Sequence, residues 1–237
     1  MRDAHFEVHA QPELDPAWVA AHCDANTHVV VAFPSDSVTD VHIAPALVHA
    51  ATISYVSSTG VYGELSGVVD DTTQLSQTHS ARAERRVLAE QSYRAVGATI
   101  LRCPGIYGPD RGLHMRVLRG EHRIPGDGQR FSSRIHVADL AQLLLASGAS
   151  RAWRAQTFVV GDLEPAPHIQ VVRFICDQYR VPMPAAEPLE AAHESLRADR
   201  RVDATRALGL LGVTLQYPSY RQGMAPAATG IVPVGKA

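Results

Sequence analysis

Residues Thr52–Gly63, with the sequence TISYVSSTGVYG, decide the fold that the rest of this 237-residue chain must complete. The segment opens with β-branched and aromatic residues, which favour a buried strand. It then presents the hydroxyls of Ser57, Ser58 and Thr59 together, followed by Gly60. Ligands of open α/β sheets bind just outside the carboxyl ends of the strands, so these hydroxyls are candidates for chemistry. The same letters also fit a serine-rich turn after a core strand.

Composition and charge are those of an ordinary globular chain. Hydrophobic residues make up 46% and charged residues 19%, and the formal net charge is −2, which indicates neither a nucleic-acid partner nor a membrane surface. No stretch approaches the roughly 18 apolar residues of a membrane span. Cys23, Cys103 and Cys176 are odd in number and far apart, so we expect a reducing, cytoplasmic setting. His5 and His9 share a face, but no Cys, Asp or Glu completes a ligand set, so no metal site is expected.

Strand and helix patterns alternate along the chain, which predicts an α/β fold with a mostly parallel sheet in three layers. Apolar runs predict strands at residues 28–33 (HVVVAF, covered on both faces), 52–56, 98–103 and 157–160. Asp15-Pro16 is a helix start, with an N-cap residue followed by proline at the first helical position. Further helices are expected at 81–95, from 137 through 146, at 169–179 and at 200–208, and a loose tail at 225–237.

Four segments, in order, resemble the extended short-chain dehydrogenase/reductases, the NAD(P)-dependent epimerase/dehydratase family. VSSTGVYG at 56–63 is similar to the active-site strand, and RCPGIYGP at 102–109 to the strand and loop beside the nicotinamide. RIHVADLA at 134–141 resembles the start of the substrate region, and YPSYRQGM at 217–224 the C-terminal signature. The match runs from about residue 28 to 224 and is nearest to an atypical branch of the family.

The resemblance implies one Rossmann-like domain over residues 1–224, with an interleaved substrate lobe at about 111–135 and 161–224. It also implies NAD or NADP as cofactor and a small-molecule substrate, either a carbonyl or hydroxyl metabolite or a nucleotide sugar. Family members often dimerise through a four-helix interface, and the helix at 81–95 would contribute to it, so a homodimer is one expected state.

Individual residues take their expected roles from the same resemblance. Ser58 matches the catalytic Ser/Thr, whose hydroxyl polarises the substrate oxygen, and Thr59 stands beside it. Residues expected near the cofactor are Phe33, Pro34, Ser57, Arg86, Pro104, Gly105 and Ile106. Residues expected near the substrate are Tyr62, Tyr107, Arg134 and His136. Pro104-Gly105 also fits a plain strand-ending turn, and His136 also fits a satisfied core histidine.

The chain departs from the family at the phosphate-binding loop. Dinucleotide folds open with a strand, a G-x-G-x-x-G-type loop and a helix, because backbone N–H groups must approach a pyrophosphate closely. This sequence has no glycine before Gly60, so it is expected to start about one strand–helix–strand unit late, which leaves strand 28–33 as an apolar sheet edge. Three explanations stay open: a start inside a longer protein, a second chain that completes the sheet, or a rearranged domain without nucleotide binding.

A second departure concerns the family's Tyr-x-x-x-Lys pair. Aligning Glu90 on the family's glutamate places Arg86 at the lysine and Arg82 at the tyrosine. Arginine keeps its proton near neutral pH, so Arg82 cannot serve as the acid/base, a loss that costs about 10²–10⁴ in rate. Arg86 could still offer charge to a ribose or phosphate, although both arginines also fit a solvated helix face. Tyr62 and Tyr107 are the possible substitute phenols.

Two functions therefore remain open from sequence. One is an NAD(P)-dependent epimerase/dehydratase-like or reductase-like enzyme, favoured by the complete VSSTGVYG and PGIYGP segments. The other is a non-catalytic relative that binds a metabolite, a nucleotide or a partner protein, favoured by the two departures. Arg102, at an otherwise apolar strand end, is expected either to pair with a carboxylate such as Asp139 or to reach a ligand anion.

Overall fold

A computed structural model describes residues 7–10, 13–36, 38–75 and 80–233 of the chain. Its centre is a parallel sheet in the order β1-β2-β4-β9, formed by His28–Val31, Thr52–Ser58, Thr99–Cys103 and Thr157–Val159. The two inner strands, β2 and β4, pair in register from Ser54 opposite Thr99 to Ser58 opposite Cys103. All five residues of β4 are buried, as expected for a strand covered on both faces. The predicted Rossmann-like α/β class is confirmed.

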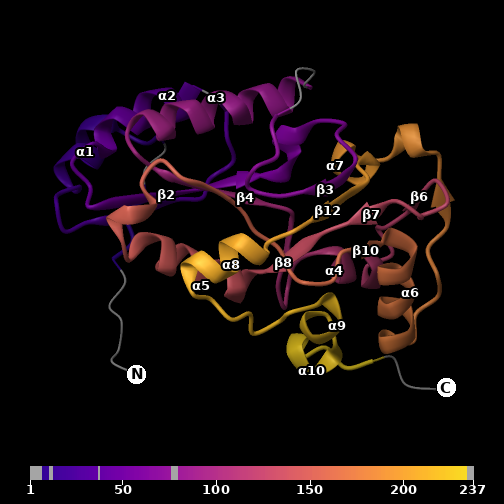
Figure 1. Cartoon of the computed structure of the whole chain (residues 1–237). Coiled ribbons are helices and arrows are strands. Elements are labelled where there is room, and N and C mark those ends of the chain that lie inside the picture. Colours follow the sequence, from indigo (N-terminus) through magenta and orange to yellow (C-terminus); the bar gives the residue numbers. More distant parts are fainter. Residues whose placement is uncertain (1–6, 11–12, 37, 76–79, 234–237) are drawn as a thin grey trace.

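Helices cover both faces of this sheet (Figure 1). One face carries α1 (Pro16–Ala21), α2 (Val38–Ile43), the 3-10 helix η1 (Ala44–Leu47) and α3 (Ala81–Ala95). The other face carries α5 (Val137–Gly148) and α8 (Thr205–Leu211). Two starts follow local sequence, since Asp15 caps α1 ahead of Pro16 and Ser80 caps α3 by accepting the N–H of Ala83 at 3.3 Å.

Side chains alternate along β2 and β4, so each strand supplies both cores. Tyr55 and Ile100 join the core under α3, whereas Leu101 and Cys103 join the core that α5 and α8 cover. Ser54 points toward α5, where its hydroxyl lies 2.7 Å from that of Ser147. Because of this two-residue period, the hydroxyls of Ser57 and Ser58 point to opposite faces of the sheet.

A second group of elements lies beyond the carboxyl ends of the strands (Figure 1). Its helices are α4 (Leu113–Leu118), α6 (His168–Tyr179), α7 (Glu194–Arg197), α9 (Tyr220–Gly223) and α10 (Pro226–Thr229), with the short 3-10 turns η2 (Thr59–Tyr62) and η4 (Leu189–Ala191) in the connections. The 3-10 turn η3 (Arg151–Trp153) lies instead at the amino ends of the strands, where the Trp153 carbonyl accepts the hydroxyl of Thr99 at 2.8 Å. Four two-stranded pairs complete it: β5 (Gly105–Tyr107) with β8 (Arg134–His136), β3 (Gly67–Val69) with β12 (Arg200–Val202), β6 (Ile124–Pro125) with β11 (Ala186–Glu187), and β7 (Phe131–Ser132) with β10 (Ala166–Pro167). Helices α4, α6 and α9 and strands β5, β6 and β10 share a core around Val172, Ile175 and Tyr220, whereas η2, β3 and β12 pack together around Tyr62, Val69 and Val202.

Three local predictions are wrong. Residues 200–208, predicted as one helix, begin as strand β12, because pairing with β3 from far earlier in the chain overrides the local pattern. The tail predicted to be loose contains α10, where the Tyr179 hydroxyl lies 2.6 Å from Thr229 Oγ1. Strand β1 is not covered on both faces, since Val30 is 50% exposed.

In the described part of the chain β1 pairs with β2 alone, so it is the sheet edge that the sequence predicted. No helix among the described residues is both long and apolar enough to span a bilayer.

A buried ion pair ties α3 to the sheet directly behind the hydroxyl-rich turn. Arg102 on β4 donates to Glu90 on α3 through Nη2, at 2.8 Å, and through Nε, at 3.0 Å, and both side chains are more than nine-tenths buried. Ser57, in register with Arg102, donates its hydroxyl to the same carboxylate at 2.5 Å. The expected partner of Arg102 was a carboxylate such as Asp139. Asp139 instead accepts the backbone N–H groups of residues 216 and 217.

Replacing Glu90 should leave the Arg102 guanidinium buried without its counter-charge. We expect Glu90→Ala to lower the free energy of unfolding by about 3–5 kcal/mol, measured by urea denaturation. Glu84→Ala is the matched control, because Glu84 is an exposed carboxylate in the first turn of the same helix and should cost less than about 1 kcal/mol. Equal losses in the two variants would contradict a structural role for the buried pair.

Candidate functional site

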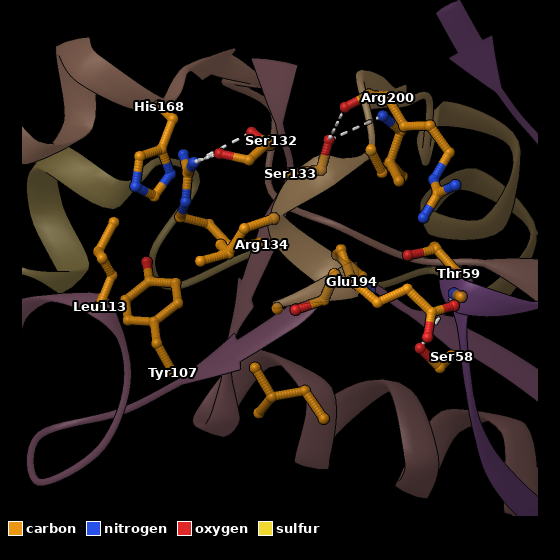
Figure 2. A pocket seen from close by; sticks show the side chains of 18 of the residues that line it. Ser58, Thr59, Tyr107, Leu113, Ser132, Ser133, Arg134, His168, Glu194 and Arg200 are labelled. Carbon is orange, nitrogen blue, oxygen red and sulfur yellow. Dashed lines mark hydrogen bonds between the residues drawn. The ribbon is translucent and has the colours of Figure 1, made fainter. Parts of the chain in front are cut away.

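A cavity of about 350 Å³ lies at the carboxyl ends of β2 and β4. Its walls come from η2, the first turns of α3, strand β5, helix α4, the segment 131–134 and the segment 194–202. In Figure 2, Ser58 and Thr59 lie on one side of the cavity, and Arg134, His168 and Tyr107 lie on the opposite side. The cavity therefore lies between the central sheet and the second group of elements, at the carboxyl ends of the strands, which is where an open α/β sheet places its ligands.

The hydroxyl-rich turn divides its three side chains between core and cavity. Ser58 is the last residue of β2 and lines the cavity, and its Oγ accepts the N–H of Gly60 at 3.1 Å, which starts η2. Thr59 follows and also lines the cavity. Ser57 points to the other face of the sheet, toward Glu90, and is 3% exposed. The expected cofactor contact of Ser57 is thus replaced by a bond inside the core.

The segment after β4 brings the second set of expected residues to the same cavity. Pro104, Gly105 and Ile106 line it, followed by Tyr107. Strand β5 runs parallel to β8 and pairs Gly105 with Arg134, which places Arg134 in the cavity wall as well. Burial raises the pKa of Tyr107, so its phenol keeps its proton near neutral pH and offers no base there.

The two arginines of α3 reach the cavity from the amino-terminal part of that helix. Arg82 lines it and lies 3.0 Å, Nη1 to Nε2, from His193, the residue before α7. Arg86 also lines it, and its Nη1 donates to the Tyr55 hydroxyl at 3.2 Å and to the carbonyl of residue 56 at 3.3 Å. Neither arginine faces only solvent.

Four further expected site residues lie away from the cavity. Tyr62 is fully buried, donates to the carbonyl of Asp70 at 3.3 Å and accepts from Arg102 at 3.1 Å, so it is a core residue. His136 caps α5 by accepting the N–H of residue 138 and lies against the ring of Tyr217 with centroids 3.9 Å apart. Phe33 packs partly buried against the core under α3, and neither it nor Pro34 lines the cavity.

Sequence reasoning missed four charged or titratable residues that line the cavity. They are Arg116 on α4, His168 at the start of α6, Glu194 on α7 and Arg200 on β12. Each reaches the site through long-range packing. Glu194 accepts the hydroxyl hydrogen of Ser80 at 2.5 Å across 114 positions, and Arg200 donates to the carbonyl of Gly63 across 137 positions. The surrounding sequence of these residues carries no motif that could have marked them.

Burial sets the protonation of three side chains at or near the cavity wall. His168 and His122 face each other with their Nε2 atoms 2.9 Å apart, and burial lowers their pKa values to about 3 and about 4. Both rings are therefore neutral at neutral pH. Asp162 is 1% exposed, and burial raises the pKa of its carboxyl to about 7, although the nearby charge of Arg134 acts to lower it. Among the described residues, no three His, Cys, Asp or Glu side chains gather in a way that could hold a metal ion.

Comparison with solved structures identifies the fold. The chain has the fold of MoeE5, solved in complex with UDP-glucose and NAD, with a TM-score of 0.74 and 21% identity over 89% of this chain and 80% of that one. It is likewise similar to the UDP-glucuronic acid 4-epimerase of Bacillus cereus, solved with NAD, with a TM-score of 0.70 and 17% identity over 89% of this chain and 75% of that one. This is the Rossmann-like fold of NAD-dependent epimerases and dehydratases.

A third structure establishes the family. A conserved protein of unknown function from Silicibacter pomeroyi DSS is 33% identical over 86% of this chain and 77% of that one, with a TM-score of 0.71. The chain belongs to the same family as that protein. No family model and no curated protein matches the sequence.

Asp162 should make stability depend on pH in a defined direction. Its pKa is about 7 in the folded state and about 3.9 in unfolded chains. Between these values the folded state holds a proton that the unfolded state has lost. This contribution is therefore complete below about pH 4 and is lost as the pH rises through 7. We expect the stability of wild type relative to Asp162→Asn to fall by on the order of 4 kcal/mol from pH 4 to 8.

Urea denaturation at a series of pH values measures this difference. The control is Asp177→Asn, which removes an exposed carboxyl from α6. If the free energies of unfolding of wild type and of Asp162→Asn change in parallel across the pH range, burial does not raise the pKa of the Asp162 carboxyl and the prediction is wrong.

Proposed function

We propose that this protein is an NAD(P)-dependent epimerase/dehydratase-like or reductase-like enzyme that takes a small hydroxyl or carbonyl compound into the cavity. One observation carries the proposal. The hydroxyls of Ser58 and Thr59 and the segment Pro104–Ile106, which the family resemblance pairs around a nicotinamide, line one cavity although they lie at the ends of two different strands, β2 and β4. The solved complexes of MoeE5 and of the Bacillus cereus epimerase with NAD support the choice of cofactor.

The residues fit the nicotinamide end of such a cofactor better than its pyrophosphate. At the nicotinamide end, the Ser58 hydroxyl and the backbone around Gly105 border free space. For the pyrophosphate, the sequence before Gly60 offers no glycine turn whose N–H groups could approach phosphate oxygens. Arg86 is the side chain proposed to offer positive charge to the ribose or phosphate, because it lines the cavity beside the end of β2.

The chain's own residues can position a substrate and polarise it. A nicotinamide cofactor, when bound, supplies hydride transfer. The Ser58 hydroxyl can donate a hydrogen bond to the oxygen of a substrate carbonyl or hydroxyl. Arg82, at the position of the family's tyrosine, moves no proton and contributes charge only. Catalysis by this arrangement is therefore expected to be slower than in relatives that have the tyrosine.

Cofactor binding separates this proposal from a non-catalytic metabolite-, nucleotide- or partner-binding role. We expect NADH or NADPH to bind with micromolar affinity in a fluorescence titration. Arg86→Met should weaken this binding by about ten-fold, because it removes one charged contact. Arg85→Met is the matched control, since Arg85 is the exposed neighbour of Arg86 on α3 and does not line the cavity. No binding of either dinucleotide at millimolar concentration would overturn the proposal and favour the non-catalytic role.

A further inference from the structure

Among the described residues, the side chains that line the cavity carry more positive than negative charge. Its charged lining residues are five arginines and one carboxylate: Arg82, Arg86, Arg116, Arg134, Arg200 and Glu194. The whole chain carries a formal charge of −2, so this excess is local. A concave site lined by one sign of charge concentrates ligands of the opposite sign.

Arg134 is the most deeply buried of these cations. It is 4% exposed, its Nη2 donates to the carbonyl and hydroxyl of Ser132 at 3.0 and 2.7 Å, and its Nη1 has no hydrogen-bond partner among the described residues. No carboxylate of the described chain forms an ion pair with it. The acidic side chain with the strongest electrostatic effect on Arg134 is Asp162, but burial raises the pKa of that carboxyl to about 7 and so weakens its negative charge near neutral pH. The ring of Tyr220, 5.0 Å away, offers only a weak cation–π contact.

Arg200 is the second buried cation, and it lies on the other side of the cavity. It is 8% exposed and donates Nη1 to the carbonyl of Gly63, without an ion pair among the described residues. Figure 2 shows its guanidinium beside Thr59, on the side of the cavity where Ser58 also lies, whereas Arg134 lies with His168 across the cavity. Burying a charge is costly unless an opposite charge or full hydrogen bonding compensates it, so both positions favour an anionic ligand.

The size of the cavity limits that ligand. Its volume of about 350 Å³ is near the lower end of the roughly 300–1,000 Å³ of small-molecule sites, and part of that space is already assigned to a nicotinamide ring. Little room remains for a second nucleotide.

We infer that the substrate is a small organic anion, a carboxylate or a phosphate ester, and not a nucleotide sugar. Its anionic group binds Arg134, and its hydroxyl or carbonyl oxygen lies on the opposite side between Ser58 and Arg200. This assignment rests on the proposed function for the role of Ser58. It extends that function by naming the anion-binding residue and the substrate class.

Isothermal titration calorimetry of the full chain tests the inference with four probes. Propane-1,2-diol has a neutral hydroxymethyl group where lactate has its carboxylate and is otherwise identical to it. Inorganic phosphate distinguishes a phosphate ester from a carboxylate, and UDP-glucose represents a nucleotide sugar. We expect lactate or phosphate to bind with an affinity that falls as salt rises, and propane-1,2-diol not to bind. Equal binding of lactate and the diol, binding of neither anion, or tighter binding of UDP-glucose than of both anions would overturn the inference.

Variants locate the anion. Arg134→Met should weaken anion binding by about 10- to 100-fold, as expected for loss of a charge-assisted hydrogen bond, while Arg134→Lys should retain part of it. Arg173→Met, an exposed site on α6 away from the cavity, is the control and should bind like wild type. Binding by Arg134→Met equal to that of the control would refute the assignment, and if this variant does not fold, the four wild-type titrations decide. NADH binding without anion binding would refute this inference alone and leave the proposed function standing.

Discussion

The bidentate pair between Glu90 and Arg102 is the interaction on which the site's geometry depends. It fixes α3 against β4 at the level where both inner strands end, and Ser57 adds a third polar group to the same buried cluster. Because side chains alternate along a strand, anchoring Ser57 toward α3 turns Ser58 to the other face and leaves it at the cavity. The cluster thus sets the direction of the hydroxyl that the proposed chemistry uses. A slip of one residue would exchange the two serines.

Local patterns predicted the elements that build this frame, and long-range packing decided the rest. The strands at 52–58 and 99–103 and the helix at 81–95 follow from β-branched runs and a serine cap that nearby residues determine. Residues 200–202 form a strand only because β3 lies beside them, and Arg200 enters the cavity by that pairing. Tyr62 belongs to the motif that marks the site, yet the 3-10 turn after Ser58 carries it into the core. The motifs predicted which segments border the candidate cavity better than they predicted the direction of each side chain.

The arginines of α3 stand at the departure from the Tyr-x-x-x-Lys pair of the family that the sequence resembles. Arg82 stands where relatives are expected to have a tyrosine, and Arg86 where they have a lysine, so α3 supplies charge without a titrating phenol. Arg116, Arg134 and Arg200 add to that charge from three other elements. A site of this kind is better suited to hold and polarise an anion than to exchange protons with it. The titratable groups of the cavity agree with this, because burial keeps the His168 ring neutral and keeps the proton on the Tyr107 phenol near neutral pH.

Thiol accessibility tests the central geometric claim most directly. Ser58→Cys and Ser57→Cys, each prepared in a Cys23→Ser background, place a thiol at adjacent positions of β2, while the native Cys103 and Cys176 are buried. Intact-protein mass spectrometry after brief iodoacetamide treatment counts the alkylated thiols. The account predicts rapid labelling at position 58 and protection at position 57. Equal labelling at the two positions, or protection at 58 with labelling at 57, would contradict it.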